Sequence, residues 1–135
     1  MNQTIRQLLD TADLLLTDTG EPATPAVTSV PAESAATTAS RCRGAAFALR
    51  VALESAVADR LTVNRAPHAI REGTQRAAFL WLRSCAEAGT ARRAKAVWSQ
   101  LCLGCHYHQY EIGPTEDQVR AWRTEVAAIV ALLAL

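Results

Sequence analysis

One ten-residue stretch contains most of the side chains in this chain that could bind a metal or do redox chemistry. Residues 101–110 read LCLGCHYHQY and contain two of the four cysteines, two of the three histidines and both tyrosines. Within it, Cys102, Cys105 and His106 form a Cys-x-x-Cys-His string. Such strings serve in covalent haem attachment, in zinc binding and in thiol chemistry. Which of these chemistries is feasible depends on the secondary structure of residues 101–110, because it sets the directions of the cysteine and histidine side chains.

A helix is expected over residues 91–111, because apolar residues recur there in steps of three and four. A helix turns by about 100° per residue, so Cys105 and His108 would face the core, with Cys102 and His106 on the flank. Cys102 could pair with His106, and Cys105 with His108, to hold an ion. All four cannot reach one ion, because His106 and His108 would face nearly opposite ways. The predicted metal ligands therefore fall into two separate pairs.

Each cofactor chemistry lacks a feature that it normally needs. Haem is attached outside the cytoplasm, no export signal is expected at the start of the chain, and Met1 is the only methionine. A structural zinc site uses four ligands, whereas the chain has one Cys-x-x-Cys pair. A reactive thiol pair sits at a helix N-terminus, and this one lies in the third turn or later. The sequence predicts no cofactor, with zinc or another metal as the alternative, and argues against haem.

A ligand site at one end of the helical domain is the other hypothesis for this region. His68 would lie near the level of His108 and Glu111 if a helix over 67–88 and the helix over 91–111 form a tight hairpin at Gly89-Thr90. The residues of this hypothetical site would be His68, Trp98, Cys105, His108, Tyr110, Glu111 and Trp122, with the two tryptophans as apolar walls. The competing interpretation is structural, since free cysteines and tryptophans at such positions commonly fill a core.

The elements that would position these residues are all helices, since no strand-like alternation occurs. We expect a short amphipathic helix over 1–16, a flexible Thr/Pro-rich linker over 17–30, and a helical domain over 31–135. The helices of that domain are expected over 31–61, 67–88, 91–111 and 115–133. The predicted fold is an all-α, up-down four-helix bundle with the N-terminal helix docked across it.

Particular residues mark the expected helix ends and faces. Gly89 is expected as a C-cap and Thr90 as the next N-cap, while Thr115 and Gln118 fit a capping box. Trp81 is placed on the inner face of the 67–88 helix, although Phe79 belongs to a second apolar stripe on the same helix.

Composition excludes several classes of protein. The 135 residues are 50% hydrophobic and 20% charged with a net charge of +1, which is typical of a folded domain and not of a nucleic-acid binder. The apolar C-terminal run of about ten residues is too short to span a membrane. We expect a cytoplasmic protein with reduced cysteines. No phosphate-binding loop or known catalytic motif occurs.

Arginines concentrate in the middle of the chain. Arg71, Arg76 and Arg83 lie on the expected outer side of the 67–88 helix, and Arg92 begins the next helix. They could hold an anionic ligand or a partner. A solvated face supported by pairs such as Glu72 with Arg76 is the simpler interpretation.

Residues 43–110 resemble a family of small, uncharacterised helical proteins of actinobacteria, some of them associated with natural-product biosynthesis. The resemblance rests on Arg43-Gly44, on Leu101-Cys102 and on His106-Tyr107. It implies a bacterial cytoplasmic helical protein and carries over no catalytic residue.

The leading hypothesis from the sequence is a non-enzymatic helical protein that binds a partner protein or forms a homodimer. Alanine-rich helix seams and the lack of catalytic motifs motivate it. The alternative is a small-molecule- or metal-binding protein, or an accessory enzyme, with its site around the Cys/His cluster.

Overall fold

The computed structural model describes residues 2–17, 31–106 and 113–135, with the side chains of 31–37 left out. This part of the chain is helical and contains no strand, which confirms the all-α class. Its helices are α1 (Gln3–Thr17), α2 (Pro31–Val63), α3 (His68–Arg71), α4 (Gln75–Leu82), α5 (Ala88–Cys105) and α6 (Glu116–Leu133). No helix in these ranges has both the length and the hydropathy that crossing a membrane requires.

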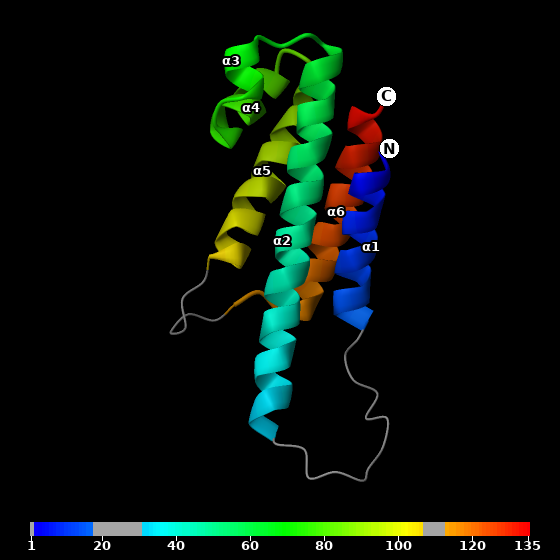
Figure 1. The fold of residues 1–135 in the computed structure, drawn as a ribbon, viewed down its shortest axis with the longest axis vertical. Coiled ribbons are helices and arrows are strands. Elements are labelled where there is room, and N and C mark those ends of the chain that lie inside the picture. The colour runs from blue at the N-terminus through cyan, green and yellow to red at the C-terminus, as the bar shows by residue number, and fades with distance from the viewer. Residues whose placement is uncertain (1, 18–30, 107–112) are drawn as a thin grey trace.

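The long helix α2 is the centre of the fold and contacts each of the other helices. Figure 1 shows α1 and α6 along one side of α2 and α5 along another, while α3 and α4 lie at the end where α2 stops. The long helices α1, α2, α5 and α6 run in alternating directions. The two chain ends therefore lie close to the same end of the molecule (Figure 1).

Alanine makes this central position of α2 feasible. Ala45, Ala46 and Ala52 are fully buried, and such small side chains let neighbouring helices approach closely, while Leu49 and Leu53 fill the remaining space. The buried residues of this helix include Cys42, Ala46, Leu49, Leu53 and Ala56, which recur in steps of three and four.

The N-terminal helix α1 shares this core. Ile5, Leu9, Ala12 and Leu16 recur at helical spacing and are all buried. From the middle of α6, Arg123 donates two hydrogen bonds to the carboxylate of Asp13 in α1, at 2.8 and 2.9 Å. Helix α1 thus packs along α2 and also contacts α6. The linker predicted over 17–30 falls, from residue 18 on, outside the described residues.

The single helix predicted over 67–88 is wrong, because the chain forms the two short helices α3 and α4 there. Gly73 separates them, and a Cβ at this position would lie 2.6 Å from the carbonyl oxygen of Ala69. Thr74 then begins α4 as an N-cap, accepting a hydrogen bond from Ala77 N at 3.2 Å. The Gly-Thr pair is a helix stop and start signal that outweighs the apolar periodicity around it.

The start of α5 also differs from the prediction. Glu87, not Thr90, is the N-cap, and its carboxylate accepts hydrogen bonds from Gly89 N at 2.8 Å and Thr90 N at 2.9 Å. Gly89 therefore lies in the first turn of α5 and caps no preceding helix. The last helix begins as predicted, since Thr115 and Gln118 form the capping box.

The placement of Trp81 on the inner face is wrong as well. Trp81 is 37% exposed, whereas Phe79 of the second apolar stripe is buried. Ala78 and Leu82 on the same helix are buried as well. Helix α4 carries apolar side chains on both sides, so periodicity alone could not choose the inner one. Phe79 stacks on Trp98 inside the core, with ring centroids 4.8 Å apart, and this contact orients α4.

Candidate functional site

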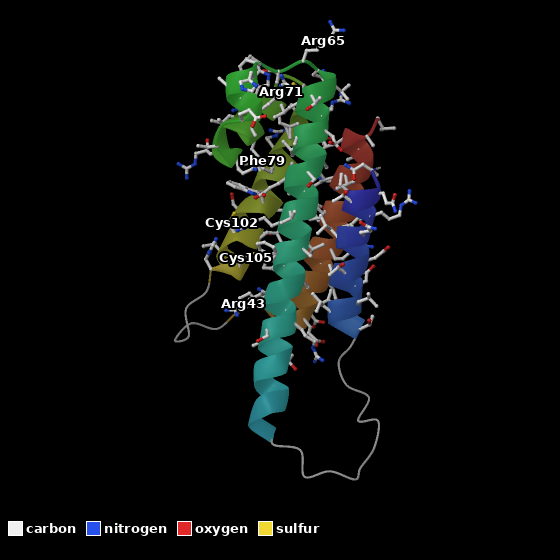
Figure 2. The ribbon with its side chains drawn as sticks, in the orientation of Figure 1. Arg43, Arg65, Arg71, Phe79, Cys102 and Cys105 are labelled. Atoms are coloured by element: carbon white, nitrogen blue, oxygen red, sulfur yellow. The ribbon has the colours of Figure 1, made fainter. Side chains whose placement is uncertain are left out.

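The Cys-x-x-Cys-His string lies at the end of α5, on the side that faces α2. Cys105 is the last residue of α5 and His106 is its C-cap, so the helix predicted to reach residue 111 ends earlier among the described residues. Cys102 and Cys105 are both partly buried, whereas the neighbouring Leu101 is fully buried. Figure 2 shows the two cysteines one turn apart on α5, with Arg43 of α2 nearby.

Arg50 of α2 organises this region. Its Nη1 lies 3.2 Å from Nε2 of His106, and its Nε lies 3.6 Å from Oε1 of Glu54. The guanidinium also lies over the ring of Phe47, 5.2 Å from the centroid. Because a guanidinium only donates hydrogen bonds, Nε2 of His106 must accept here. The lone pair that His106 would offer to a metal is therefore already used.

Trp98 continues the same network toward the core. Its Nε1 donates a hydrogen bond to Oε1 of Glu54 at 3.0 Å, and its ring stacks on Phe79 with centroids 4.8 Å apart. These contacts join α5 to α2 and α4. Trp98 thus fills an interface between helices.

Both thiols are held in the protonated form at neutral pH. Burial raises the pKa of Cys102 and outweighs the opposing effect of Arg50. Burial likewise raises the pKa of Cys105, and the neighbouring Cys102 adds to the rise. A nucleophilic cysteine needs a lowered pKa, so this pair is not set up for covalent catalysis.

The predicted metal ligands are only partly brought together. Cys102 and Cys105 lie side by side on α5, while His106 interacts with Arg50 and His108 falls outside the described residues. Within the described ranges no group of three or more His, Cys, Asp or Glu side chains could hold a metal ion. Tetrahedral zinc, with its four protein ligands in structural sites, has no complete donor set in this part of the chain.

His68 lies far from the cysteine pair. It opens α3, at the end of the molecule where α5 begins, whereas Cys105 is where α5 ends (Figure 1). The 18 residues of α5 span about 27 Å at 1.5 Å per residue. The structure does not bring His68 and Cys105 into one site. Tyr110 and Glu111, the other members of that hypothesis, lie outside the described residues.

Trp122 of α6 covers α5 on a different side. A Cβ at Gly104 would lie 2.9 Å from the Trp122 ring, so the ring rests directly on the glycine backbone. Together with Leu103, Pro114 and neighbouring residues, this ring lines an open hollow of 310 Å³. Trp122 and Trp98 thus do not form two walls of one pocket.

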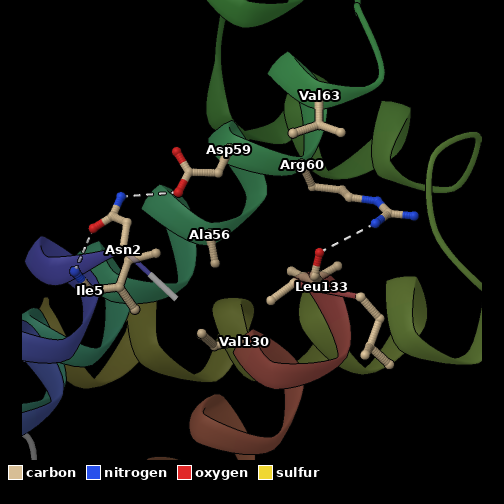
Figure 3. Close-up of a pocket in the computed structure, with 10 residues that line it drawn as sticks. Asn2, Ile5, Ala56, Asp59, Arg60, Val63, Val130 and Leu133 are labelled. Atoms are coloured by element: carbon tan, nitrogen blue, oxygen red, sulfur yellow. Dashed lines mark hydrogen bonds between the residues drawn. The ribbon is translucent and has the colours of Figure 1, made fainter.

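A second hollow, of 190 Å³, lies beside the two chain ends and was not anticipated from the sequence. Its polar side chains already have partners, as Figure 3 shows. Asn2 donates a hydrogen bond to Asp59 at 3.0 Å, and Arg60 donates to the carbonyl oxygens of Cys85 at 3.0 Å and Leu133 at 3.4 Å. A ligand would find mainly apolar wall and no convergent, unsatisfied polar groups.

Basic residues concentrate in residues 59–95, which form one end of the molecule and which we call the basic end. It contains eight basic and three acidic residues, a net charge of +5, whereas the rest of the chain has six basic and ten acidic residues, a net charge of −4. Figure 2 shows Arg65 and Arg71 at this end. The uneven distribution of charge can be counted from the sequence. The fold adds that the basic residues of α3 and α4 lie at one end of the molecule.

Exposed apolar side chains occur within the basic end. Leu80 is 47% exposed and Trp81 is 37% exposed, both on the outer face of α4. Arg76 lies on α4, four residues before Leu80, and Arg83 is the C-cap of this helix, three residues after Leu80, so these three form one stripe. Among the described residues no carboxylate lies within 4.0 Å of either arginine.

Comparisons of the chain with protein-family models, with curated proteins and with solved structures find no match.

Proposed function

We propose that this protein is a non-enzymatic helical protein that binds a partner protein with an acidic surface through its basic end. The observation that carries the proposal is the stripe formed by Arg76 and Leu80 of α4 and by its C-cap Arg83, flanked by Trp81. Arginine and tryptophan are the residues most enriched at the energetic centres of interfaces. Unpaired arginines around an apolar centre attract carboxylates and fix the orientation of the partner.

A protein partner accounts for this surface better than a nucleic acid does. A nucleic-acid surface needs a broad excess of positive charge, whereas the whole chain has a net charge of only +1. Exposed Leu80 and Trp81 gain most from burial against another apolar surface, which an amphipathic acidic helix offers. The resemblance to actinobacterial proteins suggests a partner in natural-product biosynthesis.

The long helices are the scaffold in this proposal. We take α1, α2, α5 and α6 to act as an up-down four-helix bundle that holds α3 and α4 in place at one end. A rigid scaffold limits the entropy lost on binding, which favours a small interface.

The test uses the purified full chain and a defined probe. The probe is a synthetic amphipathic helical peptide with glutamates on one face and leucines on the other, and binding is followed by its fluorescence anisotropy. We expect binding that weakens steeply with salt, and at least about a tenfold loss in the double variant Arg76→Glu, Arg83→Glu, since close charge reversals cost several kcal/mol. Arg6→Glu, an exposed arginine on α1, is the matched control and should leave binding unchanged.

Three outcomes would overturn the proposal. They are equal binding of the peptide by the double variant and the control, tighter binding of duplex DNA or RNA than of the peptide, and a homodimer that buries α4. The last is measured by light scattering and by loss of the dimer in the double variant.

A further inference from the structure

Two of the four cysteines are partly accessible and adjacent, and the protein-binding proposal does not use them. Cys102 and Cys105 occupy positions i and i+3 on the last turn of α5, where Cβ atoms lie about 5–6 Å apart. The remaining cysteines, Cys42 and Cys85, are buried in different parts of the core. The chain therefore presents one pair of thiols, on one face, next to solvent.

Two arginines of α2 act on this pair with positive charge, although burial outweighs them and the pKa of both thiols stays raised. Burial is the largest effect on both thiols, whereas Arg50 acts to lower the pKa of Cys102, and Arg50 and Arg43 act to lower the pKa of Cys105. Glu54 opposes them, but it is also within 3.6 Å of Arg50. Two thiolates formed here would face two guanidinium groups.

The donor set selects the kind of ion. Hard cations such as Mg²⁺ and Ca²⁺ need several oxygen ligands, and zinc needs more ligands than two thiolates. In the described ranges no third His, Cys, Asp or Glu joins the pair. Soft thiolates prefer monovalent copper, and a closed-shell monovalent ion accepts two ligands in a linear arrangement.

We propose that Cys102 and Cys105 form a two-thiolate binding site for a soft monovalent metal ion, with Cu(I) as the ion expected to fit it. In this reaction each thiol loses its proton to solvent, two S–Cu bonds form, and no electron is transferred. The bound group has a net charge of −1, which Arg50 and Arg43 compensate. Two protons are released for each ion bound, so the affinity rises with pH as long as the free thiols are protonated.

The test is an anaerobic titration of the reduced full chain with Cu(I) in competition with a chromophoric Cu(I) chelator. We expect one ion per chain, release of two protons in weakly buffered solution, and a thiolate-to-copper charge-transfer band in the ultraviolet. Cys102→Ser and Cys105→Ser should each weaken binding by more than about tenfold, since even the loss of an outer-shell group costs 10–100-fold.

Cys85→Ser is the matched control, because it removes a buried thiol near the other end of α5 and should leave Cu(I) binding unchanged. Circular dichroism checks that the two serine variants remain helical. We expect them to fold, because Cys102 and Cys105 are only partly buried. The proposal is overturned if Cys102→Ser, Cys105→Ser binds Cu(I) as the unmodified chain does, or if Cys85→Ser loses the ion. It is also overturned if zinc competes equally, since that requires further ligands.

Discussion

Arg50 and Glu87 are the two side chains that fix the ends of α5. Arg50 contacts His106 and Glu54 and lies over Phe47, so one guanidinium joins α2 to the end of α5. Its place explains why the Cys-x-x-Cys-His string is not a ready three-ligand site: His106 accepts from Arg50 in place of binding an ion. Glu87 has a comparable local role at the opposite end of α5, where it satisfies two free backbone N–H groups.

The carboxylate of Glu87 should make stability depend on pH. Hydrogen bonds from Gly89 N and then Thr90 N hold its pKa below the ordinary value of 4.5. A lowered folded-state pKa stabilises the fold above the unfolded-state pKa, and this contribution is lost as the pH falls through the folded-state pKa. We expect Glu87→Ala to be less stable than the unmodified chain at pH 7, with the difference shrinking below pH 4.5.

The measurement is urea unfolding of both proteins from pH 7 down to pH 3. Glu87→Gln serves as a control, because its amide oxygen still accepts a hydrogen bond and does not titrate in this range. A gap between Glu87→Ala and the unmodified chain that is as large at pH 3 as at pH 7 would show that the charge of Glu87 contributes nothing.

Two glycines within helices differ in how closely a neighbouring helix packs against them. Gly44 in α2 and Gly104 in α5 both lie inside helices, where glycine costs stability relative to alanine. A Cβ at Gly44 would meet Leu15 at 3.4 Å, an ordinary contact. A Cβ at Gly104 would come within 2.9 Å of Trp122, which requires the indole ring or α6 to move.

These two positions give a matched pair of substitutions. Gly44→Ala should stabilise the protein by about 0.5–1 kcal/mol through reduced backbone entropy of the unfolded chain. Gly104→Ala has the same backbone gain, but overpacking costs about 1–3 kcal/mol, so we expect net destabilisation and a shift in tryptophan emission. Chemical denaturation measures both, and equal stabilisation by the two substitutions would contradict the close contact between α5 and α6.

In the molecule as a whole, α1 belongs to the same core as α2 and α6. Its four buried residues join one continuous cluster that includes Leu49 and Val126. Charge is distributed less evenly than apolar area, since the basic end has a net charge of +5 and the remainder −4. A molecule of this kind orients itself toward charged partners, which is the basis of the proposed binding.

Loss of one buried side chain of α1 should therefore lower the stability of the entire protein. Leu9 is 4% exposed and Leu14 is 68% exposed on the same helix. Leu9→Ala should cost about 2–5 kcal/mol, and Leu14→Ala less than about 0.5 kcal/mol. Thermal unfolding followed by circular dichroism at α-helical wavelengths and by tryptophan fluorescence measures both variants. If Leu9→Ala left the tryptophan transition unchanged, α1 would be a peripheral attachment.

Local physics decided which segments became helices, and this much could be predicted from the sequence. The run from Pro31 into α2, the amphipathic helix α1 and the Thr115–Gln118 capping box all depend on neighbours within a few residues. The break at Gly73-Thr74 carried the same kind of local signal, a helix-ending glycine followed by an N-cap residue, and the apolar periodicity on both sides concealed it.

Only the tertiary structure decided which faces meet. Phe79 rather than Trp81 entered the core because the stack on Trp98, 19 residues later, was available to it. His106 accepts a hydrogen bond from Arg50, which lies 56 residues earlier in the chain. Cys102 and Cys105 therefore form a pair that does not include His106. The periodicity of a helix predicts which way its side chains point around its own axis. The contacts between helices depend also on how the helices lie relative to one another. Close packing of all the side chains together sets that arrangement.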